Sequence, residues 1–390
     1  MNLLFIQGSS RWKFDTEGNI YIDENLNNAI WERYRRYCDN LTVVLRSEEK
    51  IYTPEEAAAK FNPVDTSLLT AVSLPDLYRP RKNFFSINVR KAIFESIESE
   101  IMKADRIVLR SLFNMYNAQA YRICRKYNKK FLVEVADCAW ELMWYHSFAG
   151  KFFAPFIEHR YKKYILDSPF VIYVTQEAQQ KRYPTNGKYV GCSDVELENL
   201  DDNVIEKYMG KVAKGDKVIF GTAAHMHTGT KGQHYVIRAI AELRKKGITG
   251  IEYHLVGNGT PDKLLKLAKK LGVADAVKVY GLIPHDKIFA WYDHLDVYIQ
   301  PSFQEGLCRA TIEAMSRGIP VVCSNVGGSA ELADMLFRPG NVKEICAVME
   351  KVLDPEIRKR ESVRSFTKAH DYEKAKLYAR RDKFFAEFMK

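Results

Sequence analysis

Residues 301–332 read PSFQEGLCRATIEAMSRGIPVVCSNVGGSAEL, and this stretch decides how the rest of the chain is interpreted. It follows a hydrophobic run, residues 297–299, that is typical of a buried parallel strand. Pro301 and Ser302 end that strand, and Gly306 lets the backbone approach a ligand where the next helix begins. We therefore expect a strand, a loop, a helix, a second strand, a glycine turn and a further helix. The first helix should open on a ligand site.

Two glutamates in this stretch, Glu305 and Glu313, stand eight residues apart. Eight residues make a little over two helical turns, so both carboxylates are expected on one face, about 10 Å apart. Two carboxylates at different depths of one cleft suit a polyhydroxylated ligand such as a nucleotide sugar. An isolated pair at this spacing also fits a solvated helix with one exposed and one capping glutamate.

The composition predicts a well-packed globular protein with two domains. The chain has 390 residues, of which 46% are hydrophobic and 12% aromatic. No apolar run approaches the length of a membrane span, and the run at 3–6 is too short for a signal-peptide core. The seven cysteines are scattered without a C-x-x-C pair, which predicts a cytoplasmic protein without disulfides or a zinc cluster.

The charge is unevenly distributed. The net charge is +10, and residues 76–163 hold 17 basic against 9 acidic side chains. Such a positive surface attracts an anionic membrane face, a lipid-diphosphate acceptor or nucleic acid, or it is simply a soluble basic surface. No nucleic-acid-binding motif accompanies it, so we expect no nucleic-acid partner.

The first half alternates strands and helices irregularly. A strand over 2–7 leads into a loop with Gly8, a ligand-facing position in α/β domains. Residues 46–83 are expected to be irregular because four prolines punctuate them, and a linker is expected from 187 to about 200. The other expected elements are helices 25–37, 84–104 (isoleucines every four residues), 116–127 and 155–166, and strands 41–45, 105–109, 131–136 and 170–175.

An aromatic segment, residues 137–150, follows the expected strand 131–136. It begins with Asp137 and contains two tryptophans, a tyrosine and a histidine (Trp140, Trp144, Tyr145, His146). Ligands of open α/β sheets sit at the carboxyl ends of strands, so this segment is a candidate ligand contact. An aromatic patch that only covers the sheet is the alternative.

The second half alternates more cleanly and predicts a parallel sheet with helices on both faces. Lys231 stands at the head of a helix, and Gly257, Gly259 and Gly281 follow strands directly. The expected strands are 217–221, 251–256, 277–280 and 296–300. The expected helices are 233–246, 262–271, 285–293, a helical region over 341–369 and a last amphipathic helix over 371–389.

Three motifs carry a resemblance to a known family: PS-x-x-EG, EAMSRGIPVV and GG-x-x-EL, all between 301 and 332. Together they resemble the donor-site signature of the family 4 retaining glycosyltransferases, which include bacterial capsule and exopolysaccharide enzymes. The resemblance covers nearly all of 217–333 and only loosely covers 1–200. It implies a GT-B architecture, with two Rossmann-like α/β domains facing each other across a cleft. Residues 1–190 would bind the acceptor, 191–370 the nucleotide sugar, and 371–390 would form a helix that packs back on the first domain.

The resemblance also implies roles for individual residues. Lys231 would neutralise the donor diphosphate, whose negative charge grows as it leaves. Glu305 would contact sugar hydroxyls beside the amides of Gly306 and Leu307, and Glu313 would bind the ribose diol. Further donor contacts would come from Gly8, Gly257, Gly259 and, near the base, from Gly281 and Leu282.

Two positions depart from the family pattern. The family usually has a histidine after the first-domain strand where this chain has Asp137, which we take as a catalytic candidate. The family commonly pairs the lysine with an arginine near position 222, but no arginine stands between 218 and 230. His225, His227, Thr228, backbone amides or the later Arg309 are the candidate replacements.

The resemblance implies transfer of a sugar, with retention of configuration, from a UDP- or GDP-linked donor to a lipid-linked saccharide acceptor in cell-surface polysaccharide synthesis. It implies no cofactor and no metal, and same-face transfer in which the departing phosphate helps to deprotonate the acceptor. We expect a cytoplasmic protein, peripheral on the inner face of an anionic membrane. The alternatives are an epimerase or hydrolase on this fold and a non-catalytic nucleotide-sugar-binding component. A nicotinamide-dependent oxidoreductase is disfavoured because no G-x-G-x-x-G follows the first strand.

Overall fold

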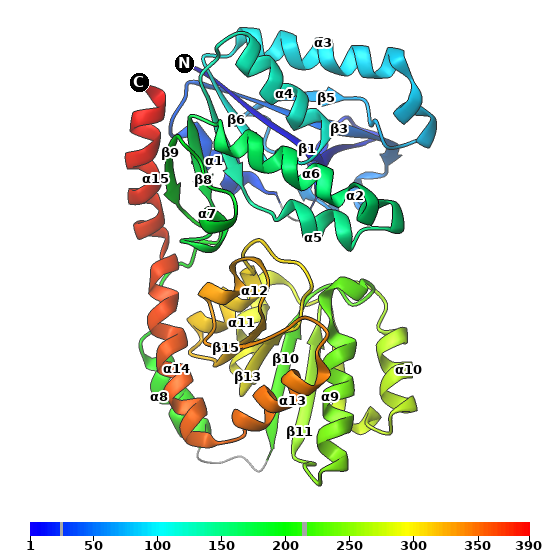
Figure 1. The fold of residues 1–390 in the computed structure, drawn as a ribbon, viewed down its shortest axis with the longest axis vertical. Helices are drawn as coiled ribbons and strands as arrows, with labels where there is room; N and C mark the ends of the chain where they lie inside the picture. The colour runs from blue at the N-terminus through cyan, green and yellow to red at the C-terminus, as the bar shows by residue number, and fades with distance from the viewer. Residues whose placement is uncertain (24–25, 213–216) are drawn as a thin grey trace.

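The computed structural model describes residues 1–23, 26–212 and 217–390 and has two α/β lobes (Figure 1). Within the described residues the strands form a nine-stranded sheet in the first lobe and a six-stranded sheet in the second. Both sheets are built mainly from parallel pairs. The predicted GT-B architecture is therefore confirmed. Within the described residues, no helix is both long and apolar enough to cross a bilayer.

The first sheet has the parallel order β5-β3-β1-β6-β7-β8-β9, and the short β2 and β4 extend it in antiparallel pairs. Its strands are β1 (Asn2–Asp15), β2 (Ile20–Ile22), β3 (Asn40–Tyr52), β4 (Asn62–Pro63), β5 (Thr70–Leu74), β6 (Arg106–Arg110), β7 (Phe131–Val135), β8 (Phe170–Tyr173) and β9 (Lys188–Gly191). Its helices are α1 (Asn28–Arg35), α2 (Pro54–Ala58), α3 (Ile87–Lys103), α4 (Met115–Lys126), α5 (Ala139–Trp144), α6 (Phe148–Leu166) and α7 (Ala178–Arg182), with a 3-10 turn η1 (Arg81–Phe85).

The second sheet is parallel throughout, in the order β12-β11-β10-β13-β14-β15. Its strands are β10 (Val218–Ala223), β11 (Ile251–Val256), β12 (Val277–Gly281), β13 (Val297–Gln300), β14 (Val321–Ser324) and β15 (Met335–Phe337). Its helices are α8 (Asn203–Val212), α9 (Gln233–Lys245), α10 (Asp262–Lys270), α11 (His285–Asp293), α12 (Arg309–Ser316), α13 (Val342–Lys351) and α14 (Pro355–Ala369). The 3-10 turns η2 (Gly229–Lys231), η3 (Ala274–Ala276), η4 (Gly327–Glu331) and η5 (His370–Tyr372) connect them.

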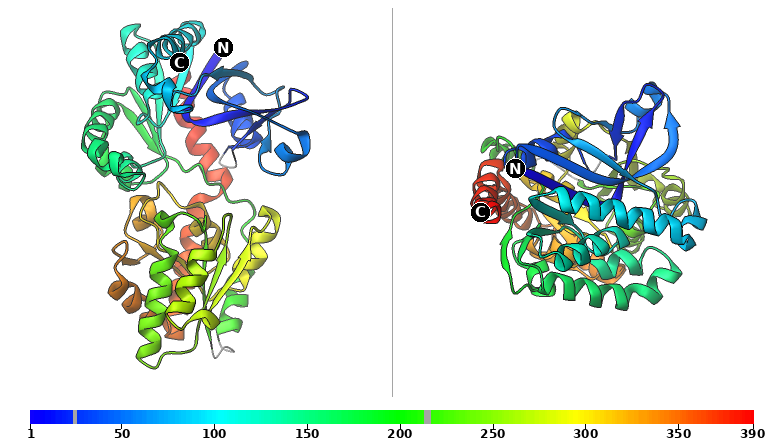
Figure 2. Two further views of the ribbon diagram at one scale, coloured as in Figure 1. Left: turned by 90° about the vertical axis from the view of Figure 1, so that its right-hand side faces the viewer. Right: turned by 90° about the horizontal axis from the view of Figure 1, so that it is seen from above.

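The last helix, α15 (Lys374–Met389), runs from the second lobe back to the first (Figures 1 and 2). Phe385 stacks on Tyr37 with ring centroids 4.2 Å apart, and Phe388 meets Phe170 at 5.4 Å. Arg106 of β6 donates to the carbonyls of the last turn. The predicted helix that crosses back to the first domain is confirmed, and its phenylalanines complete the core on one face of the first sheet.

The predicted helix over 84–104 corresponds to α3, which begins only at Ile87 because Phe84 and Phe85 belong to η1. Its three regularly spaced isoleucines, Ile93, Ile97 and Ile101, are buried against one face of the first sheet. This face also receives α4 and α6. The predicted helix 25–37 corresponds to the shorter α1, and its first residue, Asn25, lies outside the described residues.

The expected loop at Gly8 is wrong. β1 continues through Gly8 to Asp15 beside β3, with a shift of register between Ile6 and Arg11. A Cβ on Gly8 would lie 2.6 Å from the Cβ of Tyr116, and the Gly8 amide donates to Asn117. Gly8 therefore allows β1 to pack closely against α4, and it does not mark a loop.

Three other expectations need correction. Residues 46–83 are largely ordered, because β3 runs to Tyr52 and is followed by α2, β4, β5 and the start of η1. The expected linker 187–200 begins with β9, whose hydrogen bonds to β8 make it the last strand of the first sheet. The helix expected to begin at Gly306 begins at Arg309, and the last helix of the decisive stretch is only the 3-10 turn η4.

Candidate active site

The loop between β13 and α12 is held by unusually close packing. A Cβ on Gly306 would lie 1.9 Å from the carbonyl oxygen of Ala136, at the end of β7 in the first lobe. A Cβ on Gly327 would lie 1.8 Å from the carbonyl oxygen of Glu305, and the Gly328 amide donates to the Gly306 carbonyl at 2.8 Å. Residues 301–332 therefore fold back on themselves, and they meet the carboxyl end of a first-lobe strand where the two lobes touch.

Lys231 and Glu305 form an ion pair in this region. The Nζ of Lys231 donates to Oε1 of Glu305 at 2.7 Å, and both side chains are largely buried. Burial lowers the pKa of Lys231, but the charge of Glu305, the nearby Cys308 and the hydrogen bond to Glu305 together outweigh burial, so the net pKa is raised. The ammonium group therefore keeps its proton. Gly232, in the left-handed region at φ 71°, turns the chain from η2 into α9 so that Lys231 faces the loop of Glu305.

Gln300, at the end of β13, orients the carboxylate of Glu305. Its Nε2 donates to Glu305 Oε1 at 3.2 Å and to the hydroxyl of Ser302 at 2.7 Å, while Tyr298 donates to its Oε1. All three of these supporting residues are buried. Such a network orients the carboxylate before any ligand arrives.

Glu313 is buried in α12 and has partners of its own. Its Oε2 accepts from the hydroxyl of Tyr292 at 3.0 Å, and its Oε1 lies 3.1 Å from Nε2 of His285, which is exposed. The hydrogen bond to Glu313 raises the pKa of His285. Glu313 and Glu305 thus belong to two separate hydrogen-bonded groups of the same lobe. Sequence reasoning did not single out His285, although it follows the β12 strand end by four residues.

The loops after β10, β11 and β12 lie together at the carboxyl edge of the second sheet. Gly257 donates its amide to the carbonyl of Gly281 at 2.9 Å, and both glycines have positive φ. A Cβ on Gly259 would lie 2.3 Å from Nδ1 of His227. These predicted positions are therefore brought together, with Leu282 exposed beside them.

Two histidines are among the candidate replacements for the expected arginine. The rings of His225 and His227 lie 5.7 Å apart, and both residues are exposed in the loop after β10. The carbonyl of His225 accepts from Gln233 of α9 at 3.1 Å, which ties this loop to the head of that helix. Arg309 is also exposed and lies within electrostatic reach of His285 and of Asp194.

Asp137 faces this group from the first lobe. The hydroxyl of Ser111 donates to its Oδ2 at 2.9 Å. Burial raises the pKa of Asp137, and the negative charge of Glu305 contributes in the same direction. A Cβ on Gly306, the residue after Glu305, would lie 3.7 Å from the Cα of Asp137, so the two loops meet across the lobes. Ser111 has φ 63°, an uncommon conformation for a residue other than glycine, and such strain concentrates at functional sites. Sequence reasoning missed Ser111 because backbone strain leaves no sequence pattern.

The aromatic segment after Asp137 contacts both lobes. Trp140 and Trp144 stack at 5.2 Å, and Tyr145 meets Phe303 of the second lobe at 5.1 Å between ring centroids. Gly8, in contrast, lies in β1 and packs on α4. The segment is therefore more than a cover for its own sheet, because it forms part of the contact between the lobes.

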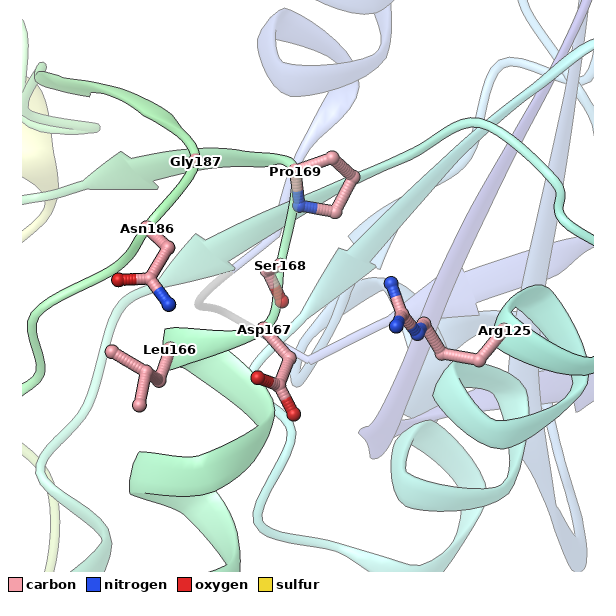
Figure 3. Close-up of a pocket in the computed structure, with 7 residues that line it drawn as sticks. All are labelled: Arg125, Leu166, Asp167, Ser168, Pro169, Asn186 and Gly187. Atoms are coloured by element: carbon pink, nitrogen blue, oxygen red, sulfur yellow. The ribbon is translucent and has the colours of Figure 1, made fainter.

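A separate pocket of about 290 Å³ lies in the first lobe (Figure 3). Arg125, Asp167 and Asn186 line it together with the residues that precede β8 and β9. These are the amino ends of parallel strands, opposite to the edge where Asp137 lies. Because α/β sheets bind ligands at the carboxyl ends of their strands, this pocket is not a candidate for the active site.

Comparison with known proteins identifies the family. Residues 217–355 match the model of the family described as glycosyl transferases group 1. Protein CapJ of Staphylococcus aureus is 30% identical over 357 residues, which span 90% of this chain and 86% of CapJ. The chain belongs to the group 1 glycosyltransferases. The matched range contains both glutamates, Lys231 and the glycine loops.

Solved glycosyltransferase structures share the fold of this group 1 enzyme. HepE of Anabaena, in complex with UDP, has a TM-score of 0.66 at 15% identity, covering 99% of this chain and 100% of HepE. The lipopolysaccharide outer core galactosyltransferase WaaB has a TM-score of 0.65 at 14% identity, covering 99% of each chain. At such identities the likeness establishes the two-domain architecture of this glycosyltransferase and nothing finer.

Proposed function

We propose that this glycosyltransferase moves a sugar from a nucleotide-sugar donor, with retention of configuration, to a lipid-linked saccharide acceptor in cell-surface polysaccharide synthesis. The observation that carries the proposal is the Lys231–Glu305 ion pair, oriented by Gln300 and placed opposite Asp137. A protonated amine next to a carboxylate offers a cation for phosphate and acceptor oxygens for sugar hydroxyls in one place.

The donor diphosphate becomes the leaving group, so its negative charge grows in the transition state. We assign the stabilisation of that negative charge to Lys231. His225, His227 or Arg309 and the backbone amides of Gly306 and Leu307 would contribute to it. Fixed cations of this kind make the reaction independent of a metal ion. A UDP-linked donor is supported by HepE, which has the same fold and has been solved with UDP-glucose. A GDP-linked donor is the other nucleotide class to test.

Glu305 binds hydroxyls of the transferred sugar, and Glu313 binds the ribose diol with His285 at the rim. The base lies near Gly281 and Leu282, beside the glycine loops of Gly257 and Gly259. Asp137, whose pKa is raised by burial, contacts the transferred sugar from the acceptor domain. The acceptor hydroxyl attacks the anomeric carbon on the face that the diphosphate leaves, and the departing phosphate takes the hydroxyl proton.

We place the acceptor at the inner face of the cell membrane. The protein would reach it from the cytoplasm. Support comes from the basic excess of residues 76–163 in the acceptor domain, since cationic surfaces are attracted to anionic leaflets. A lipid anchor on the acceptor would then meet the protein at that surface.

Slow hydrolysis of the donor in the absence of acceptor tests this chemistry. UDP- and GDP-sugars with α linkage are incubated with the protein, and the released sugar is followed by NMR before mutarotation. We expect the α anomer first, at a rate that EDTA does not change. Initial release of the β anomer would contradict retention, and loss of turnover with EDTA would contradict metal independence.

A further inference from the structure

The outer face of α6 carries phenylalanines that the fold leaves in solvent. Phe148, Phe152, Phe153 and Phe156, called here the phenylalanine face, are 91%, 80%, 51% and 66% exposed. The opposite side of α6, with Ala154, Tyr161 and other residues, packs into the first domain. At 100° per residue, the four phenylalanines fall on the side of the helix away from that packing. A helix that is apolar on its inner and its outer face has a second surface to bury.

The charge along α6 is mainly positive, and the exposed Asp167 lies just beyond its last turn. From 142 to 166 the sequence holds Lys151, Arg160, Lys162 and Lys163, and its single acidic residue, Glu158, is buried against Arg182. Exposed phenylalanines next to lysines, with no exposed carboxylate among them, are complementary to an anionic lipid surface rather than to an acidic or a neutral protein groove.

A second segment, Arg79–Ile87, repeats this chemistry next to it. Its outermost side chains are Phe85 and Ile87, 81% and 80% exposed, and it carries three exposed basic residues, Arg79, Arg81 and Lys82. No acidic residue occurs between 77 and 94. The two surfaces are connected through the segment before α4. Arg160 of α6 donates to the carbonyl of Phe113 at 2.7 Å, and the amide of Met115 donates to the hydroxyl of Tyr78, which stacks on Phe84.

The phenylalanine face also lies close to the contact between the two lobes. Tyr145, three residues before Phe148, contacts Phe303 of the nucleotide-sugar domain. Figure 1 shows α5, which leads into α6, at the edge of the first domain that faces the second. Lys151 lies over the ring of Trp144, which links the start of α6 to the aromatic segment after Asp137.

We propose that the phenylalanine face of α6 and the segment Arg79–Ile87 together insert into the surface of an anionic bilayer and hold the mouth of the cleft against it. This inference rests on the proposed function in one respect, since a lipid-linked acceptor gives the contact its purpose. The phenylalanines enter the headgroup region while Lys151, Lys163 and the arginines of the second segment meet lipid phosphates. A lipid-linked acceptor then reaches Asp137 and Glu305 from the side, without leaving the bilayer.

Vesicle flotation with the full-length protein tests the inference. Vesicles of phosphatidylcholine alone are compared with vesicles that contain about one-third phosphatidylglycerol. We expect binding to the anionic vesicles, weakened by salt. F148S/F152S should lower the partition coefficient at least about tenfold, because two large apolar side chains lose their burial. K151Q/K163Q should lower the partition coefficient about fivefold or more for each charge removed, because each basic residue near an anionic leaflet contributes to binding.

Matched controls come from exposed residues of the second domain. L265S/V363S removes two exposed apolar side chains, and K266Q/K270Q removes two exposed lysines of α10. Both should bind vesicles like the wild type. Wild-type protein that ignores anionic vesicles, or F148S/F152S that binds as the wild type does, overturns the inference. The inference is also overturned if the protein is a dimer that F148S/F152S dissociates while vesicle binding persists. The phenylalanine face would then hold two copies together.

Vesicle binding needs neither donor nor acceptor, and donor hydrolysis in vesicle-free solution needs no membrane. F148S/F152S should therefore hydrolyse the donor at the wild-type rate. Failed hydrolysis with intact vesicle binding would contradict the proposed function alone, and the reverse result would contradict the membrane surface alone.

Discussion

At the scale of single residues, the site is a set of carboxylates whose partners differ. Glu305 is paired with a lysine, Glu313 with a tyrosine and a histidine, and Asp137 with a serine. The sequence was enough to select Lys231, Glu305 and Glu313, because the motif spacing is local. It could not select His285 or Ser111, whose roles depend on contacts that form only when distant segments meet.

Replacement of Lys231 tests the assignment of the diphosphate cation. Lys231→Ala removes the charge nearest to Glu305, so we expect kcat to fall by about 10²–10³, the usual cost of losing one donor to a developing negative charge. Steady-state kinetics with the hydrolysed donor would measure this. Lys266→Ala on α10 is the matched control and should change kcat little. Equal kcat for wild type and Lys231→Ala would remove Lys231 from the mechanism.

The pair of His285 and Glu313 predicts a pH-dependent contribution to stability. Because the folded-state pKa of His285 is raised above its ordinary value of 6.5, protonation stabilises the fold. The contribution is complete below about pH 6.5 and disappears as the pH rises through the raised value. His285→Gln should therefore lower Tm relative to wild type at pH 5.5 and converge with it at alkaline pH. A difference that stays constant across this range would show that the charge of His285 plays no part.

At the scale of elements, most strands and helices of the second domain were predicted, although α8 and β15 were missed, and those of the first domain were predicted less well. The strands from β10 to β14 are short apolar runs, so local pattern defines them. The second half of β1, the second half of β3 and β9 have weaker patterns. They are strands because neighbouring strands supply hydrogen-bond partners. Pairing between distant segments leaves little trace in the local sequence.

A substitution at Gly8 tests whether the second half of β1 is a packed strand. Gly8→Ala should destabilise the fold by about 1–3 kcal/mol, because its Cβ would meet Tyr116 and Asn114. Gly210→Ala is the matched control within α8, where no atom lies within 4 Å of the added Cβ, and should stabilise by about 0.5–1 kcal/mol. Chemical denaturation would measure both. A stability of Gly8→Ala equal to wild type would support a loop with free space instead of a packed strand.

At the scale of the whole molecule, Glu331 of the GG-x-x-EL motif joins the two lobes. Its carboxylate accepts from the amides of Gln176 at 2.7 Å, of Glu177 at 2.8 Å and of Ala178, all at the start of α7 in the first domain. A carboxylate at the free amides of a helix start is a favourable charge-assisted contact. Together with the close approach of Gly306 to Ala136, it holds the lobes in the arrangement seen here. The motif was predicted to belong to the donor site, and nothing in its sequence indicated a bond to the other domain.

Loss of this contact should loosen the arrangement of the lobes. In Glu331→Ala three amides lose their acceptor, each bond worth about 1.5–3 kcal/mol when the acceptor is charged. We expect a larger radius of gyration by small-angle X-ray scattering and slower donor hydrolysis. Glu177→Ala, which removes an exposed carboxylate from the same region, should change neither. A Glu331→Ala protein with the scattering profile and activity of wild type would show that other contacts hold the lobes.

The central claim is that one cleft, marked by Lys231 and Glu305, binds the nucleotide sugar. Thermal unfolding with UDP, GDP and their common sugar conjugates tests it most directly, on wild type, Lys231→Ala, Glu305→Gln and the control Lys266→Ala. A ligand at 100 times its Kd should add about 2.7 kcal/mol of stability. The account predicts that one nucleotide sugar stabilises wild type and Lys266→Ala, and that both cleft substitutions weaken the shift. Stabilisation that is unaffected by either cleft substitution, or absent for every nucleotide, would contradict it.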